Sequence, residues 1–200
     1  ERLVFFHLYK KNKMLTLSFT PFPILESNRL LLRAVSTDDV NEILELRGNP
    51  ETMKFIPRPL VTSTEMALEH IGMITEKIEN NIGINWAITV KGNPKLLGVI
   101  GHYRIQTENY RSEIGYMLLP EYQGQGIVSE AINMVLEYGF NVLNFHSVEA
   151  VVDPENHVSA KVLEKNGFVK EAHFLENEYW DGKFWDSAVY SLLKRNFVKK

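Results

Sequence analysis

The positions of apolar residues along the chain follow two periods, one typical of helices and the other of strands. Apolar residues at every third or fourth position predict helices over residues 38–48, 64–80, 127–143 and 156–166. Runs rich in β-branched and aromatic residues predict strands over residues 29–35, 84–90, 96–105, 111–119, 146–152, 168–180 and 184–193. The side chains expected to point inward from the second helix are those of Met66, Ile71, Ile74 and Ile78.

The order of these elements shows no internal repeat. Turn signals at Gly92-Asn93-Pro94 and Asp181-Gly182 join neighbouring strands, which favours antiparallel pairing. The pattern therefore predicts a mixed α/β (α+β) domain with one mostly antiparallel central sheet flanked by helices.

One connection in this pattern carries candidate chemistry. Pro120 ends the strand over residues 111–119, and Gln123-Gly124-Gln125-Gly126 opens the next helix. Two glycines let successive N–H groups converge, and a helix start adds unpaired donors and partial positive charge. This combination is an anion site, most often for phosphate. A strand–glycine–helix turn is equally common as a plain connection, so these residues alone leave both readings open.

Composition excludes several classes of protein. The chain has 200 residues, 44% of them hydrophobic, enough for one large domain or a domain with a tail. It has no cysteine, which excludes disulfides, thiolate zinc sites and a cysteine nucleophile. A net charge of −3 without a dense basic run argues against a nucleic-acid partner, and no apolar run is long enough to span a membrane. The six histidines lack paired ligand spacing, so we predict no metal site. The lack of cysteine permits a reducing compartment, and we predict a cytoplasmic protein.

The first 26 residues differ from the rest. The apolar run at residues 3–6 precedes Lys10, Lys11 and Lys13, the reverse of the order in a secretory signal. Met14 is a plausible natural start, which would make residues 1–13 an upstream extension or a cloning remnant. We therefore predict an N-terminal arm over residues 1–26 and one folded domain over residues 27–200.

A second segment makes the chain resemble a known family. Residues 156–168, NHVSAKVLEKNGF, follow the glycine turn by about thirty residues, and the two together resemble the Gcn5-related N-acetyltransferases (GNAT family). The family signature Gln/Arg-x-x-Gly-x-Gly/Ala matches residues 123–128 except at Val128, whose bulk narrows the cofactor's approach. The resemblance covers residues 28–194. It is nearest to the RimJ/RimL branch, through SNRLLLR at residues 27–33 and EIGY at residues 113–116.

The resemblance implies acetyl-CoA as the donor and a twisted sheet splayed at the cofactor site. Backbone groups of the splayed strand would bond the pantetheine arm, and N–H groups of the turn would hold the pyrophosphate. Asn156 would bond the cofactor arm, cap the following helix, or do both. The implied cofactor-binding residues are Met117, Leu118, Leu119, Gln123, Gly124, Gln125, Gly126, Ile127, Val128 and Asn156.

The resemblance also implies catalytic roles. Many members place a tyrosine acid where this chain has Leu163, which cannot donate a proton. The branch instead uses the serine three residues after the asparagine, here Ser159, and a carboxylate base four residues before the glycine of the hairpin turn, here Glu178. Glu113 is the rival base. For each of the three, a solvated or ion-paired surface residue is the plain alternative.

The implied activity is transfer of an acetyl group to a primary amine, in the first place the α-amine of a protein or peptide N-terminus. At pH 7, deprotonation costs roughly 1–1.4 kcal/mol for an α-amine and about 4.6 kcal/mol for a lysine. An α-amine therefore needs only a weak base. A small amine, such as a polyamine, amino acid or aminoglycoside, is the alternative acceptor, and a non-catalytic acetyl-CoA-binding module is the third reading. Family analogy implies a homodimer, and acceptor walls at residues 55–64 and 179–185.

Overall fold

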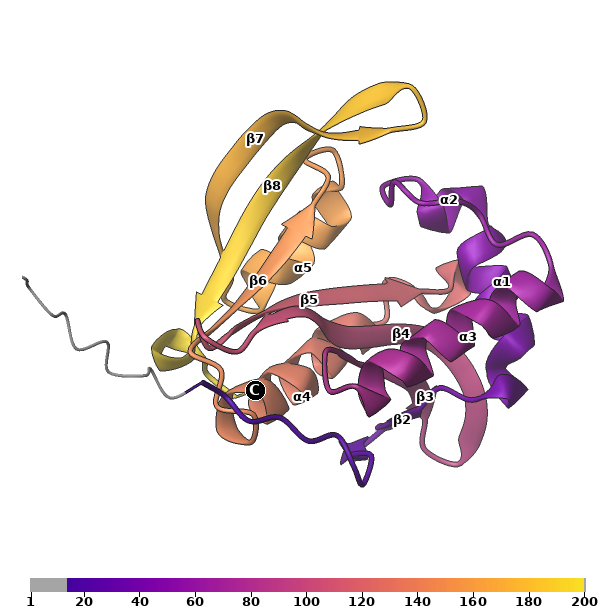
Figure 1. Ribbon diagram of the computed structural model, residues 1–200, viewed down its shortest axis with the longest axis horizontal. Coiled ribbons are helices and arrows are strands. Elements are labelled where there is room, and N and C mark those ends of the chain that lie inside the picture. The colour runs from indigo at the N-terminus through magenta and orange to yellow at the C-terminus, as the bar shows by residue number, and fades with distance from the viewer. Residues whose placement is uncertain (1–13, 200) are drawn as a thin grey trace, which may run out of the picture.

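The computed structural model describes residues 14–199, so the extension predicted over residues 1–13 lies outside the described part. An eight-stranded sheet with the order β1-β2-β3-β4-β5-β6-β8-β7 forms the centre (Figure 1). Its strands are β1 (Leu25–Glu26), β2 (Leu30–Ala34), β3 (Ile84–Val90), β4 (Asn93–Gln106), β5 (Arg111–Leu118), β6 (Ser147–Val152), β7 (Val169–Trp180) and β8 (Lys183–Leu193). The helices are α1 (Val40–Gly48), α2 (Pro50–Met53), α3 (Thr64–Glu79), α4 (Ile127–Asn141) and α5 (His157–Lys165).

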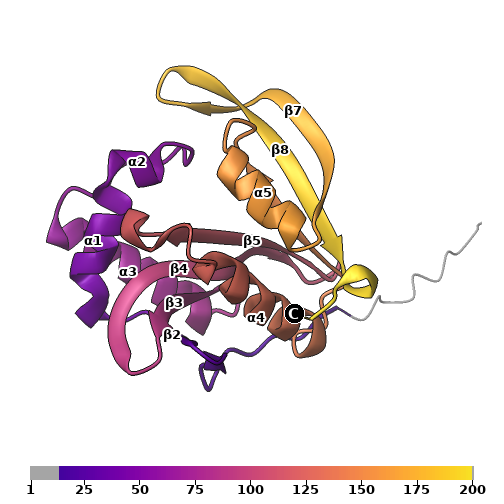
Figure 2. The same cartoon turned by 180° about the vertical axis from the view of Figure 1, so that it is seen from behind.

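Helices cover both faces of the sheet. Figure 1 and Figure 2 show α1 and α3 on one face and α4 and α5 on the other. Each face has its own hydrophobic core: Trp86, Phe140 and Phe145 belong to the α4 side, and Ile43 and Leu46 belong to the α1 side. All strand pairs are antiparallel except β5 with β6. The predicted mixed, mostly antiparallel sheet flanked by helices is therefore confirmed.

One predicted core position was wrong. Met66 is 36% exposed, whereas Ala67, Ile71 and Ile74 of α3 are buried. These three residues lie at i, i+4 and i+7, a spacing that puts one stripe of a helix against the sheet. Met66 is one residue off this stripe, about 100° around the helix. The small side chain of Ala67 lies at the inward position instead.

Part of the N-terminal arm packs onto the sheet. Phe19 is buried, and the indole Nε1 of Trp86 donates a hydrogen bond to the Pro23 carbonyl oxygen at 2.7 Å. Leu25 and Glu26 then pair with β2 as the edge strand β1. Residues 19–26 thereby cover one edge of the sheet.

The sheet opens between β5 and β6. The two strands run parallel and pair only from Arg111 with Ser147 to Glu113 with Glu149. At the same level, the register of β4 against β5 shifts between Tyr103 and Gln106, with Arg104 at a φ of +42°. Such a bulge bends a strand and increases its twist. The splay expected from the family is confirmed, and it leaves the β6-facing edge of β5 unpaired beyond Glu113.

The long hairpin of β7 and β8 extends the sheet beyond the opening. Its turn is the predicted Asp181-Gly182, and both residues have positive φ, 50° and 77°, as a two-residue hairpin turn of this kind requires. Figure 1 shows the tip of this hairpin facing α2 across the opening. The hairpin therefore brings residues near 180 close to residues near 55.

Candidate active site

The glycine turn at the start of α4 has the conformation that an anion site needs. Gly124 and Gly126 have φ of +72° and +75°, in the left-handed region that favours glycine. A Cβ at Gly124 would meet no atom within 4 Å, so this part of the turn is open. Gly126 is the N-cap residue of α4. The turn is exposed, and half-buried Val128 packs against the core beside it.

The backbone of this turn presents unused donors. Within residues 14–199, no acceptor lies within hydrogen-bonding distance of the N–H groups of residues 124–129. The first intrahelical bond runs from the N–H of Glu130 to the carbonyl of Gly126. The free N–H groups and the partial positive charge of the helix start can therefore act together on an anion.

A buttress of side chains holds the turn from behind. The Arg29 guanidinium pairs with the Glu130 carboxylate at 2.5 Å, and its Nη2 donates to the carbonyl oxygen of Gln125 at 3.1 Å. The Ser27 hydroxyl donates to the other oxygen of Glu130 at 2.5 Å. Gln123 Nε2 donates to the carbonyl oxygen of Leu118 at 3.2 Å. In the sequence, Ser27 and Arg29 stand out only as part of a family motif. No local pattern marks their contact with Glu130, about a hundred residues away.

Helix α5 places a hydroxyl pair at the opening. Asn156 caps the helix, because its Oδ1 accepts a bond from the Ser159 N–H at 3.0 Å. The Ser159 hydroxyl lies next to that of Tyr116 on β5, without the geometry of a full hydrogen bond, so the buried phenol has no full partner within the described residues. Burial raises the pKa of Tyr116 to about 12, and the neighbouring Ser159 offsets only part of that rise. Tyr116 was not among the predicted site residues, although the EIGY motif contains it.

The position of α5 is fixed by the buried Asn166. Its Oδ1 accepts bonds from Asn133 Nδ2 at 2.6 Å and from the Ser129 hydroxyl at 3.1 Å, both on α4. Its Nδ2 donates to the carbonyl oxygen of Val162 within α5 at 2.7 Å. These bonds connect the helix carrying Ser159 to the helix that begins at the glycine turn.

The two candidate bases lie on the other side of the opening. Glu113 of β5 forms an ion pair with Arg104 at 2.8 Å. Burial raises the pKa of Glu113; the charges of Glu149 and Glu178 act in the same direction, and Arg104 opposes them. Glu178 of β7 is half-buried and forms no ion pair within residues 14–199. Glu113 and Glu178 thus lie close enough for their charges to interact, and both are candidates for the catalytic base.

Strand β5 separates the hydroxyls from the carboxylates. Successive side chains of a strand point to opposite faces. Tyr116 points to the α5 side, toward Ser159, whereas Glu113 and Met117 point to the α1 side, where Met117 Sδ lies 3.8 Å from Arg47 Nη1. Proton donors and proton acceptors are therefore arranged on opposite faces of one strand.

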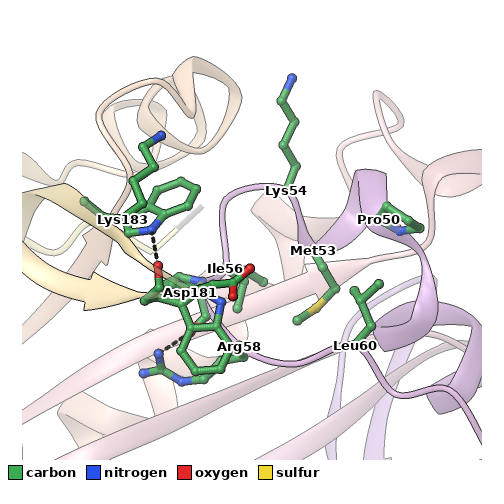
Figure 3. A pocket seen from close by; sticks show the side chains of 11 residues that line it. Pro50, Met53, Lys54, Ile56, Arg58, Leu60, Asp181 and Lys183 are labelled. Carbon is green, nitrogen blue, oxygen red and sulfur yellow. Dashed lines mark hydrogen bonds between the residues drawn. The ribbon is translucent and has the colours of Figure 1, made fainter.

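A pocket of about 340 Å³ lies between the α2 region and the tip of the β7–β8 hairpin (Figure 3). The two segments expected to form acceptor walls both line it. The first contributes Ile56, Pro57, Arg58 and Leu60, and the second contributes Trp180, Asp181, Lys183 and Trp185. The volume is within the range of small-ligand pockets, roughly 300–1,000 Å³.

The histidines have other roles. His102 is fully buried, with ring nitrogens 3.1 Å from the Val135 carbonyl oxygen and 2.9 Å from the Ser112 hydroxyl. Burial lowers its pKa to about 4, so it is neutral and packed. His173 pairs with Asp186 at 2.8 Å. No cluster of three metal-ligating side chains occurs among the described residues, and no helix among them is long and apolar enough to cross a membrane.

Comparison with known proteins identifies the family. The model of the acetyltransferase (GNAT) domain matches residues 29–169, more than half of the chain. The chain therefore belongs to the GNAT family and is an acetyl-CoA-dependent N-acetyltransferase. The uncharacterized N-acetyltransferase YoaA of Bacillus subtilis (strain 168) is 34% identical over 173 residues, covering 86% of this chain and 98% of YoaA.

Two solved structures with bound coenzyme A have the same fold. RimL, a ribosomal L7/L12 α-N-protein acetyltransferase in complex with coenzyme A, has a TM-score of 0.78 at 23% identity, covering 86% of this chain and 98% of RimL. Spermidine N-acetyltransferase from Vibrio cholerae, in complex with CoA and spermine, has a TM-score of 0.75 at 26% identity, covering 85% and 98%. The two are named for different acceptors, so the fold leaves the acceptor class open.

Replacing Glu113 with Gln removes a carboxyl group whose pKa the fold raises. Such a group binds its proton more tightly in the folded chain. The wild type therefore loses stability as the pH rises from 4.5, the ordinary glutamate value, through the raised pKa. We expect the difference in free energy of unfolding, Glu113→Gln minus wild type, to increase between about pH 4 and about pH 7. Urea unfolding at both pH values measures this gain, and a difference that stays constant or shrinks would contradict it.

Proposed function

We propose that this enzyme transfers the acetyl group of acetyl-CoA to the α-amine of a protein or peptide N-terminus. The observation that carries the proposal is the division of β5, whose Tyr116 points toward Ser159 on one face, whereas Glu113, which interacts electrostatically with Glu178, points to the other face. Direct transfer needs a proton donor for the departing thiolate and an acceptor for the amine proton. These two tasks fall on opposite sides of the thioester, as do the two groups of side chains.

In this proposal the free N–H groups of residues 124–129 bind the pyrophosphate of acetyl-CoA. The edge of β5 left unpaired beyond Glu113 bonds the pantetheine amides as an added strand would, through the backbone at Met117 and Leu118 and onward at Leu119. Asn156 contributes its Nδ2 to the cofactor arm, since its Oδ1 already caps α5. The buttress of Ser27, Arg29 and Glu130 keeps the turn in its anion-binding form.

Ser159 is the proposed acid. As the acceptor nitrogen bonds to the thioester carbon and the C–S bond breaks, the sulfur takes the hydroxyl proton of Ser159. The neighbouring Tyr116, whose pKa of about 12 keeps it protonated at neutral pH, can donate a hydrogen bond to the Ser159 oxygen. That bond would stabilise the charge left on Ser159 and make it a better donor.

Glu178 is the proposed base. Glu113 is already bound to Arg104, whereas Glu178 has no ion pair within the described residues and lies near Glu113 on the hairpin that also lines the pocket. A carboxylate is a weak base, which suits an α-amine better than a lysine or polyamine, because the α-amine is close to neutral at physiological pH.

The acceptor assignment is tested with two peptides of one sequence that contains a lysine. One has a free N-terminus and the other an acetylated N-terminus. We expect release of free thiol from acetyl-CoA with the first peptide and at most slow release with the second. Mass spectrometry locates the acetyl group. Equal rates with both peptides, or modification of the lysine alone, would contradict the α-amine assignment.

The catalytic roles are tested by removing each group. We expect Glu178→Gln and Ser159→Ala each to lower kcat by about 100-fold or more, the usual contribution of a positioned acid or base. Tyr116→Phe should have a smaller effect and should have none in the Ser159→Ala background, because Tyr116 is proposed to act through Ser159. Thermal unfolding of each variant separates loss of catalysis from loss of the fold.

Glu171→Gln is the matched control, since Glu171 is an exposed glutamate on the same strand as Glu178. Its kcat should equal that of the wild type. If Glu178→Gln and Ser159→Ala together left acetyl transfer intact, both role assignments would be wrong.

A further inference from the structure

The arginines near the pocket differ from most others in the described chain. Arg29, Arg33, Arg104 and Arg111 each form an ion pair with a carboxylate. Arg47 of α1 and Arg58 of the pocket wall form none within residues 14–199. Arg195, near the C-terminal end, is exposed to water. Burial lowers the pKa of Arg47 and the charge of Arg58 acts in the same direction, so the two unpaired arginines lie close enough to interact.

Arg47 is the more unusual of the two. It is half-buried, and its Nε is buried without a hydrogen-bond partner among the described residues. The contact of its Nη1 is the thioether of Met117 on β5, at 3.8 Å. Burial lowers the pKa of neighbouring His70 to about 4, with Arg47 contributing, so this histidine is neutral and supplies no counter-charge.

The pocket itself is lined by more cations than anions. Lys54 and Lys183 lie over the rings of Phe55 and Trp185, at 5.3 Å and 4.2 Å. Figure 3 shows both lysine side chains extending to the same side of the pocket from opposite walls. Asp181 is the acidic residue of the lining. With Arg58, three cationic residues and one anionic residue line this space.

These charges indicate what the pocket binds. Native proteins pair their buried polar groups, and an unpaired one leaves hydrogen-bonding capacity for a ligand. A guanidinium matches a carboxylate in charge and in its two parallel N–H groups, with bonds stronger than those between neutral groups. Arg47 contacts Met117 of β5 and is close enough to Arg58, in the pocket wall, for their charges to interact. A carboxylate held there would be close to the place proposed for the reacting amine.

We propose that the acceptor of this enzyme carries a carboxylate near its reacting amine and that Arg47 and Arg58 bind this carboxylate. The inference rests on the proposed function, because it places the acceptor amine between β5 and the hairpin. Two kinds of molecule supply the chemistry: a protein N-terminus with an acidic side chain in its first residues, and a free amino acid through its α-carboxylate. A polycation such as spermidine meets like charges at Arg47, Arg58, Lys54 and Lys183.

The test compares acceptors that carry a carboxylate with acceptors in which an amide replaces it. The peptides Ser-Asp-Ala-Ala and Ser-Asn-Ala-Ala, both amidated at the C-terminus, form the first pair, and free serine and serine amide form the second. We expect kcat/KM to be higher by about 10-fold or more for the charged member of at least one pair, the gain from a charge-assisted bond. The pair that shows the preference identifies the source of the carboxylate, and a preference in the serine pair alone would support the carboxylate inference while overturning the peptide N-terminus as the acceptor. Spermidine should be the poorest acceptor.

Variants then locate the preference in the protein. Arg47→Gln and Arg58→Gln are each expected to bring the charged-to-neutral ratio of kcat/KM down toward one, and Arg58→Glu to favour Ser-Lys-Ala-Ala amide instead. The ratio compares acceptors on one preparation, so it does not depend on the fraction of enzyme that is folded. Arg195→Gln, which removes an exposed arginine far from the pocket, should keep the wild-type ratio.

The outcomes separate this inference from the proposed function. If α-amines are acetylated at equal rates whatever their charge, or if spermidine is preferred, the carboxylate inference is wrong and acetyl transfer to an amine still stands. A preference that Arg47→Gln and Arg58→Gln both leave unchanged also overturns it. If no acceptor of either pair is acetylated and spermidine alone is, the proposed function is wrong as well.

Discussion

The whole site depends on the point where β5 and β6 stop pairing. A parallel pair joined through only three residue pairs, Arg111 to Glu113 on β5, leaves the rest of β5 with an unsatisfied backbone edge. Unpaired N–H and C=O groups in a protein interior are costly, and an extended ligand can satisfy them as an added strand does. The opening also lets α5 approach one face of β5 and the hairpin of β7 and β8 approach the other. The proposed cofactor site and the positions of the hydroxyl pair and the carboxylates all follow from this one interruption.

The cofactor end and the β6 side of the opening are held by polar contacts between distant parts of the chain. At the cofactor end, Arg29 and Glu130 connect the second strand to the first turn of α4, and Arg29 also binds the carbonyl of Gln125. On the β6 side, Arg111 binds Glu149 at 2.6 Å where the two strands last pair. The hydrogen bond from Arg29 to the Gln125 carbonyl oxygen helps to hold the turn in the conformation in which its N–H groups point outward. The acceptor end lacks such pairing at Arg47, which is why that end is the one expected to bind a charged group.

Much of this could be predicted from the sequence because it is encoded locally. The glycine turn, the cap at Asn156 and the Asp181-Gly182 hairpin depend on residues close together in the chain, and the structure has all three. Met66 was placed wrongly because a single-residue error in helix phase moves a side chain out of the core. Tertiary packing between residues far apart in the chain creates the other features. These are the buried environment of the Tyr116 phenol, the unpaired Nε of Arg47 and the contacts among Ser27, Arg29 and Glu130. No local pattern marks these contacts, so only the folded chain reveals which arginines lack a carboxylate.

The central claim is that main-chain N–H groups at the start of α4 bind the diphosphate of the acetyl carrier. Isothermal titration calorimetry with coenzyme A and with pantetheine, which lacks the diphosphate and nucleotide, tests it most directly. The account predicts saturable binding of coenzyme A and an affinity for pantetheine lower by about 100-fold or more, since the charge-assisted bonds to phosphate are lost. Equal affinity for the two compounds, or no binding of coenzyme A, would contradict the account.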